Sequence, residues 1–253
     1  MIIKNFLTKL YISKYYYIFT FLCLITGLIK ELLAITILLV FHELGHYIIS
    51  YLYKWKINNI TLYPFGGFIK YDEIIDKPLK EEFFITLAGP LNQLIIFIFI
   101  YFLYKNNILS SYFYNIFKNY NNYLLFFNFL PIVPLDGSKL INVLLNKVLS
   151  FKISNYIIIM ISILSLIIVT ILYFNNSYII ILSFLIFEII KFIKNLKILH
   201  NRFILEKYLY NNEYKKRKII KNINKMMRNK KHIIKYNNMY LCEKEVIRKI
   251  KGV

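Results

Sequence analysis

The sequence contains few cysteines, few glycines and few acidic residues. Its 253 residues include only two cysteines, Cys23 and Cys242, which excludes both a disulfide framework and a cysteine-based zinc site. Only seven residues are Gly, 58% are hydrophobic and the mean hydropathy is +0.52. An ordinary soluble domain has a different composition, so the sequence predicts a polytopic membrane protein.

Six apolar runs are each long enough to cross about 30 Å of hydrocarbon. They cover residues 15–29, 32–53, 83–104, 123–145, 155–174 and 178–193. No small-residue cleavage site follows the first run, so we expect an uncleaved first span rather than a removed signal peptide. The predicted fold is therefore an all-α membrane protein with six transmembrane helices.

The lysines gather on one side of this predicted topology. The N-terminal lead, the loops after spans two and four and the tail carry most of them, whereas the other side carries only Lys30, Lys105 and Lys118. The positive-inside rule then predicts that both termini are cytosolic.

The tail holds most of the excess positive charge. From residue 191 to the end, 19 Lys and Arg stand against four Glu. Contact with the lipid bilayer explains these charges more simply than binding to nucleic acid, which we do not expect. We predict a membrane domain of residues 1–195 and a short basic cytosolic region of residues 196–253.

His42, Glu43 and His46 form an HExxH motif inside the second apolar run. Positions i and i+4 of a helix share a face, so both imidazoles can bind one metal ion from the same side. In zinc hydrolases this motif supplies two neutral histidine ligands and a glutamate that takes the proton of a water. The simpler alternative is two buried core histidines at a chance spacing. Three ionisable groups at membrane depth favour the functional interpretation.

Residues 127–138, in the fourth run, include Pro131, Pro134 and a glycine. We expect the span to break there and to expose its backbone to the protein interior. Asp136 then lies in the membrane, where a lone carboxylate costs roughly 2.5 to 3.5 kcal/mol and needs a positive partner. A zinc ion held by two histidines is the best candidate. The alternative is that Asp136 caps a helix that begins near Ser138.

Residues 55–71 show an alternating apolar pattern that is interrupted by Gly66 and Gly67. This pattern predicts a β-hairpin with the glycines between its strands. Its edges would leave hydrogen bonds unmet in lipid, so we expect it to be membrane-associated and to lie against protein near the active site. A plain cytosolic loop is the alternative. In span three, Pro90 should bend the helix, and we assign both Pro90 and Asn92 to helix packing.

The two motifs together resemble the site-2 protease family of intramembrane zinc metalloproteases, peptidase family M50. The second family motif, N-x-x-P-x-x-P-L-D-G, is matched by Asn128, Pro131, Pro134, Leu135, Asp136 and Gly137. The resemblance implies that one Zn²⁺ is bound by His42, His46 and Asp136. It implies that Glu43 is the general base. It also implies that Asn128 holds the substrate or stabilises the oxyanion, with Pro131 and Pro134 shaping the break beside it.

Within the family, the six-span layout and the lack of room for a PDZ domain resemble the bacterial members that process a pro-sigma factor during sporulation. The expected substrate is therefore a membrane-associated pro-sigma factor, cleaved at the cell membrane. We expect the substrate to be extended, because a helix hides its carbonyl groups, and to add as a strand beside Gly66, Gly67 and the broken span. Inhibitory membrane partner proteins and a homo-oligomer are left open.

Two other functions stay open. A protease of this family can instead cleave an anti-sigma factor or membrane remnant peptides, although the absence of a PDZ-sized insertion disfavours the anti-sigma version. A zinc-binding scaffold or transporter without hydrolysis would keep the histidines, but it has no reason to place Glu43 between them.

Overall fold

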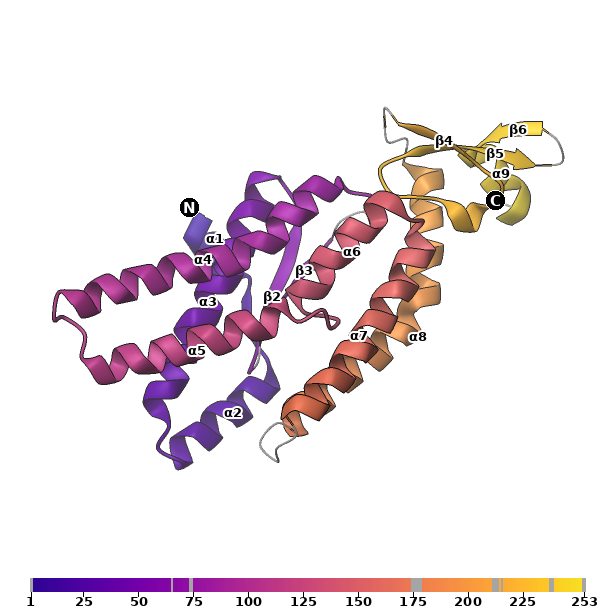
Figure 1. The fold of residues 1–253 in the computed structure, drawn as a ribbon. Helices are drawn as coiled ribbons and strands as arrows, with labels where there is room; N and C mark the ends of the chain where they lie inside the picture. Colours follow the sequence, from indigo (N-terminus) through magenta and orange to yellow (C-terminus); the bar gives the residue numbers. More distant parts are fainter. Residues whose placement is uncertain are drawn as a thin grey trace. The chain divides into compact units, whose positions relative to one another are not determined.

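The computed structural model describes residues 2–64, 66–72, 75–173, 179–210, 214, 216–236 and 239–251 (Figure 1). The chain divides into two compact units. The first comprises Met1–Glu73 and Phe84–Phe129, and the second comprises Ile74–Phe83 and Leu130–Val253. This division by packing differs from the predicted functional division after residue 195, which stays a prediction.

The first unit is built around one central helix. Its helices are α1 (Ile2–Thr8), α2 (Lys14–Ile25), α3 (Ile29–Leu52), most of α4 (Leu79–Lys105) and α5 (Ser111–Phe129). The side chains of Leu38 and Leu39 in α3 are almost fully buried and pack with Tyr16 of α2 and Leu124 of α5. Because α3 also contacts α1 and the sheet, its residues are enclosed on several sides.

Three strands form a small sheet in the first unit. β1 (Leu10–Ile12), β2 (Ile57–Tyr63) and β3 (Gly66–Tyr71) lie in the order β1-β2-β3. The antiparallel pairing of β2 with β3 confirms the predicted hairpin, so the plain-loop alternative is wrong. The parallel pairing of β1 with β2 was not predicted. The membrane association of the hairpin stays a prediction.

The predicted position of the hairpin turn is wrong. Gly66 and Gly67 are the first residues of β3, where they face Tyr63 and Leu62 of β2. The chain turns before them, at Pro64, which has no backbone N–H to give to a strand ladder. The two glycines are therefore strand residues.

Three helices of the described chain are long and apolar enough to cross a membrane. They are Ile29–Leu52, Leu79–Lys105 and Phe151–Leu172, and they overlap the predicted spans two, three and five. Helix α2 has 12 residues and extends about 18 Å by itself. Helix α8 (Ile179–Leu209) continues past the predicted end of span six, and the expected bounds Phe174 and Tyr178 lie outside the described residues. The count of six spans stays a prediction.

The predicted fourth span is interrupted, as expected. Helix α5 ends at Phe129 and helix α6 (Asp136–Val148) begins at Asp136, with Pro131 and Pro134 between them. The helix before the break begins at Ser111, earlier than predicted, because the asparagines of its first half lower its hydropathy without preventing a helix.

Ser162 of α7 (Phe151–Tyr173) binds the backbone of the break. Its Oγ accepts the N–H of Val133 at 3.1 Å, while its own proton can go to the carbonyl of Ile158 at 2.7 Å. The Val133–Pro134 peptide bond is cis. A polar backbone group beside the two prolines is thus satisfied inside the protein, as a break at membrane depth requires.

The C-terminal part of the second unit has its own sheet and core. β4 (Arg217–Ile220), β5 (Lys231–Tyr236) and β6 (Met239–Cys242) form a sheet in the order β4-β5-β6. The 3-10 helix η2 (Ile223–Lys225) and helix α9 (Glu243–Lys251) complete it. The apolar core consists of Phe151, Phe203, Ile204, Ile220, Ile223, Met226, Ile234, Val246 and Ile247. The basic tail is therefore a small folded domain built on the end of α8.

A buried ion pair ties this small domain to the segment that leads into α4. Asp76 is 2% exposed, and its Oδ2 lies 2.6 Å from the Nζ of Lys207. The other oxygen, Oδ1, accepts the N–H of Asn229 at 2.9 Å. Such a pair adds little net stability, but removing one partner leaves an uncompensated buried charge.

We expect the substitution Lys207→Gln to destabilise the second unit by roughly 3 to 5 kcal/mol, because Asp76 would lose its cation. Thermal unfolding of the purified protein in detergent measures the effect, with an expected fall of roughly 10 °C. Lys235→Gln is the control, because it removes the same charge from an exposed position of β5. Equal unfolding temperatures for the two variants would contradict the importance of the pair.

Candidate metal centre

Helix α3 brings His42, Glu43 and His46 together, as the motif spacing predicts. All three side chains are buried, with exposed fractions of 2%, 2% and 6%. The two imidazole rings lie one turn apart, with their centroids separated by 4.8 Å. The prediction that both histidines share one helix face is therefore confirmed.

Each histidine uses its Nδ1 atom for a hydrogen bond to α4. The Nδ1 of His46 lies 2.7 Å from the carbonyl oxygen of Ile85, and the Nδ1 of His42 lies 3.0 Å from the Oε1 of Gln93. The main-chain carbonyl can only accept a hydrogen bond, so the proton of His46 sits on Nδ1. With Gln93 Oε1 as acceptor, His42 is the same tautomer. Both Nε2 atoms then carry a lone pair.

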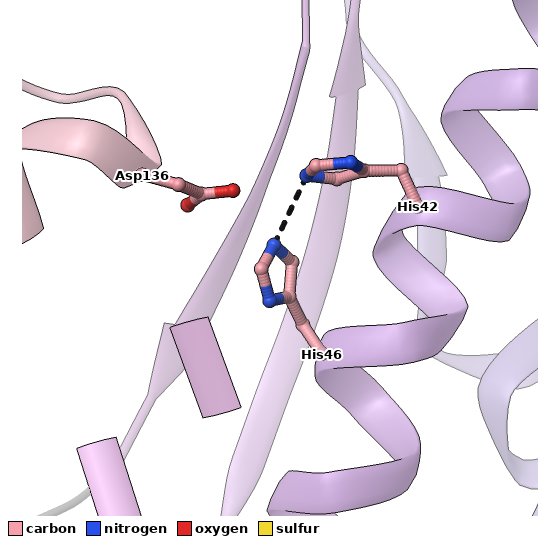
Figure 2. A group of neighbouring side chains, drawn as sticks. All are labelled: His42, His46 and Asp136. Atoms are coloured by element: carbon pink, nitrogen blue, oxygen red, sulfur yellow. Dashed lines mark hydrogen bonds between the residues drawn. The ribbon is translucent and has the colours of Figure 1, made fainter. Parts of the chain in front are cut away.

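The two Nε2 atoms face each other at 3.1 Å (Figure 2). Two neutral nitrogens with lone pairs at this separation repel, unless a cation lies in front of both. Zinc bonds of about 2.0 to 2.1 Å at a tetrahedral angle separate two nitrogen ligands by roughly 3.3 Å. The pair therefore fits Zn²⁺ in donor type, protonation and separation.

Gly89 of α4 lies against the two ring nitrogens. A Cβ built at this position would overlap the Nε2 of His46 and lie 2.8 Å from the Nε2 of His42. Only glycine leaves the space in which the two rings present their lone pairs. Its role in the site was not predicted from the sequence.

The packing role assigned to Asn92 is supported by two contacts of α4 with α3. The Nδ2 of Asn92 donates to the carbonyl oxygen of Phe41 at 2.5 Å. A Cβ on Gly45 would lie 2.7 Å from the Cβ of Asn92 and would overlap the carbonyl of Ala88. Gly45, inside the HExxH motif, therefore allows α4 to approach α3 closely.

Strand β3 passes directly beside the proposed base. A Cβ on Gly67 would overlap the carboxyl carbon of Glu43 and would lie 2.5 Å from its Oε1. Gly66 differs, because a Cβ there has no atom within 4 Å. The structure thus brings Gly67 to the motif, while Gly66 is one residue away in open space.

The residues of the second motif belong to both units. Asn128 is buried in α5 and is 6% exposed. It follows the buried Asn121 by seven residues, so both lie on one face of the helix. Pro131 and Pro134 lie in the break, as predicted.

Asp136 is the first residue of α6 and is 4% exposed. Its Oδ1 accepts a hydrogen bond from Lys139 at 2.9 Å. The capping alternative is wrong, because the helix begins two residues earlier than Ser138 and Leu135 is its N-cap residue. Figure 2 draws Asp136 with the two histidines.

Sequence comparison finds a family model and known proteins that resemble parts of this chain. Residues 30–119, which include the HExxH motif, match the model of peptidase family M50. The chain is 35% identical over 148 residues to the stage IV sporulation protein FB of Bacillus subtilis, covering 58% of this chain and 51% of that protein. It is 34% identical over 120 residues to a zinc metalloprotease of Methanocaldococcus jannaschii, covering 43% and 32% of the two chains. The chain thus spans about half the length, or less, of these relatives.

The fold resembles that of a solved structure, the site-2 protease from Methanocaldococcus jannaschii. The TM-score is 0.57, and the match covers 72% of this chain and 89% of the other. At 24% sequence identity this likeness concerns the fold alone. Residues 30–119, which carry the HExxH motif, are thus similar to peptidase family M50, and the fold of the chain resembles that of a site-2 protease.

Proposed function

We propose that this protein is an intramembrane zinc metalloprotease that hydrolyses peptide bonds in or near the membrane. The observation that carries the proposal is the pair of Nε2 atoms that converge at 3.1 Å in a buried helix, with Glu43 next to His42 in the chain. A non-catalytic zinc protein is disfavoured, because a glutamate that binds no metal would have no function between the ligands.

His42 and His46 supply two of the ligands, and we propose Asp136 as the third. Three protein ligands with one open position are typical of catalytic zinc sites. A buried carboxylate at membrane depth also needs positive charge nearby, which supports Asp136. When bound, zinc would act as a Lewis acid toward the water and the scissile carbonyl.

Glu43 performs the proton transfers in this proposal. Its carboxylate takes a proton from the attacking water and passes it to the leaving amine, so that the acid formed in the first step is used in the second. Gly67 of β3 lies against this carboxylate and limits the space on that side of it. Asn128 would hold the substrate or stabilise the developing oxyanion, a role supported by its burial on the inner face of α5.

The substrate would bind as an extended strand. β3 lies at the edge of its sheet, and the described chain places no further strand beside it. An unwound substrate segment can pair with such an edge through main-chain hydrogen bonds, which leaves its carbonyl groups open to attack. Gly66 and Gly67 would lie along this edge, and the break that contains Pro131 and Pro134 would also contact the substrate.

We propose a membrane-associated pro-sigma factor as the substrate, processed during sporulation. The support is the similarity to the sporulation protein of Bacillus subtilis. In this proposal both termini are cytosolic, the chain lies in the cell membrane and the basic tail faces anionic lipid. Cleavage of an anti-sigma factor or of membrane remnant peptides is the alternative that a substrate panel would reveal.

We expect Glu43→Gln to lower the cleavage rate roughly 10²- to 10⁴-fold while zinc content is unchanged, because the amide cannot accept the proton. Co-expression with a candidate pro-sigma factor, followed on a gel, measures cleavage, and metal analysis of the purified protein measures zinc. Glu31→Gln, the same change in the first turn of α3, should leave both values near wild type. Full cleavage by the Glu43 variant would rule out its role as the base.

We expect Asp136→Ala to lower zinc affinity more than the roughly 10- to 100-fold seen for changes outside the ligand set, because one ligand is removed. Chelator competition on the purified protein gives the affinity. Lys139→Gln removes the half-exposed cation that pairs with Asp136 and should keep near-normal affinity. If Asp136→Ala binds zinc like the wild type, the third ligand is another group.

We expect Gly67→Ala to impair cleavage strongly and Gly66→Ala to leave it nearly unchanged. The new Cβ at residue 67 would displace the Glu43 carboxylate, whereas residue 66 has room for it and an alanine still pairs through its backbone. The gel assay compares the two variants, and zinc content should be normal in both. Similar cleavage by the two would argue against the placement of β3 beside the base.

A further inference from the structure

Gln93 of α4 is completely buried and connects two helices of the first unit. Its Nε2 lies 3.2 Å from the main-chain oxygen of Asn121 and 3.1 Å from the Oδ1 of Asn121, both on α5. Its Oε1 lies 3.0 Å from the Nδ1 of His42 on α3. The Gln93 side chain therefore links Asn121 of α5 to His42 of α3.

The orientation of the Gln93 amide follows from its partners. The main-chain oxygen of Asn121 cannot donate a hydrogen bond, so the atom of Gln93 that faces it must be the NH₂ group. This leaves Oε1 facing His42, where it can only accept. The proton of His42 is thereby held on Nδ1, and its Nε2 is left as an acceptor.

The two histidines are held by different kinds of acceptor. For His46 the acceptor is the main-chain carbonyl of Ile85, whose position depends on the α4 backbone. For His42 it is a side-chain amide, whose position depends on Asn121 as well. His42 is thus the ligand whose tautomer a single substitution outside α3 can release.

We propose that Gln93 and Asn121 are positioning residues for the metal centre, which together fix the tautomer and direction of His42. This inference rests on the proposed zinc site. An outer-shell acceptor of this kind raises the basicity of a histidine ligand and orients its ring. Because Gln93 is neutral, it does so without adding a second negative charge to the buried site.

The test is the zinc affinity of the purified full chain in detergent, measured by chelator competition, together with the visible spectrum of the Co²⁺-loaded protein. Gln93→Met keeps the length of the side chain and removes all three of its hydrogen bonds, the one to His42 and the two to Asn121. We expect a roughly 10- to 100-fold weaker zinc affinity and a changed Co²⁺ spectrum. Asn121→Ala removes one of the two oxygens that orient Gln93, and it should weaken binding less.

Asn92→Leu is the matched control, because it removes the neighbouring amide of α4, which donates to the main-chain oxygen of Phe41 and not to a histidine ring. It should keep the wild-type zinc affinity and Co²⁺ spectrum. If Gln93 only packs helices, Asn92→Leu will weaken zinc binding as much as Gln93→Met, and this overturns the inference. Zinc affinities within twofold of wild type for Gln93→Met and Asn121→Ala would overturn it as well.

The same experiment separates this inference from the proposed function. A wild-type chain that binds no zinc would overturn both. A wild-type chain that binds zinc, with unchanged affinity in the Gln93 variant, would overturn only the positioning role. If Gln93→Met does not accumulate as a folded protein, the zinc affinity of Asn121→Ala tests the positioning role instead.

Discussion

The central constraint on this structure is that the Nε2 lone pairs of His42 and His46 point toward each other in the buried interior. In an apolar interior the Nε2 atoms of His42 and His46 have no reason to meet at 3.1 Å, because neutral acceptors repel. Hydrogen bonds from both Nδ1 atoms to α4 keep the rings in this arrangement. Helix α4 therefore sets the direction of both imidazole rings, and a metal ion would relieve the repulsion that this direction creates.

Three glycines provide the space for this arrangement. Gly45 lets α4 approach α3, Gly67 lets β3 pass beside Glu43, and Gly89 leaves the volume in front of both ring nitrogens. A Cβ at any of the three would overlap backbone or a motif side chain. The chain has only seven glycines, and these three serve both the close packing of α3, α4 and β3 and the geometry of the site.

The parts of the site that follow from local rules could be predicted. His42 and His46 share a face because a helix has 3.6 residues per turn, and the helix breaks between α5 and α6 because of its prolines. The turn was placed wrongly, because two adjacent glycines indicate a turn and a close approach equally well. The register of β3 with β2 and the contact of Gly67 with Glu43 distinguish the two.

Gln93 and Asn121 could not be found from the sequence. Each is an amide in a helix with no motif around it, and they meet across 28 residues of chain. The sequence alone predicted apolar helices, the shared helix face of His42 and His46 and the break, because these depend on periodicity and covalent geometry. Only the tertiary structure decided which carbonyl oxygen accepts a hydrogen bond from each histidine and which glycine borders Glu43. Those contacts join separate elements, and only packing brings them within hydrogen-bond distance.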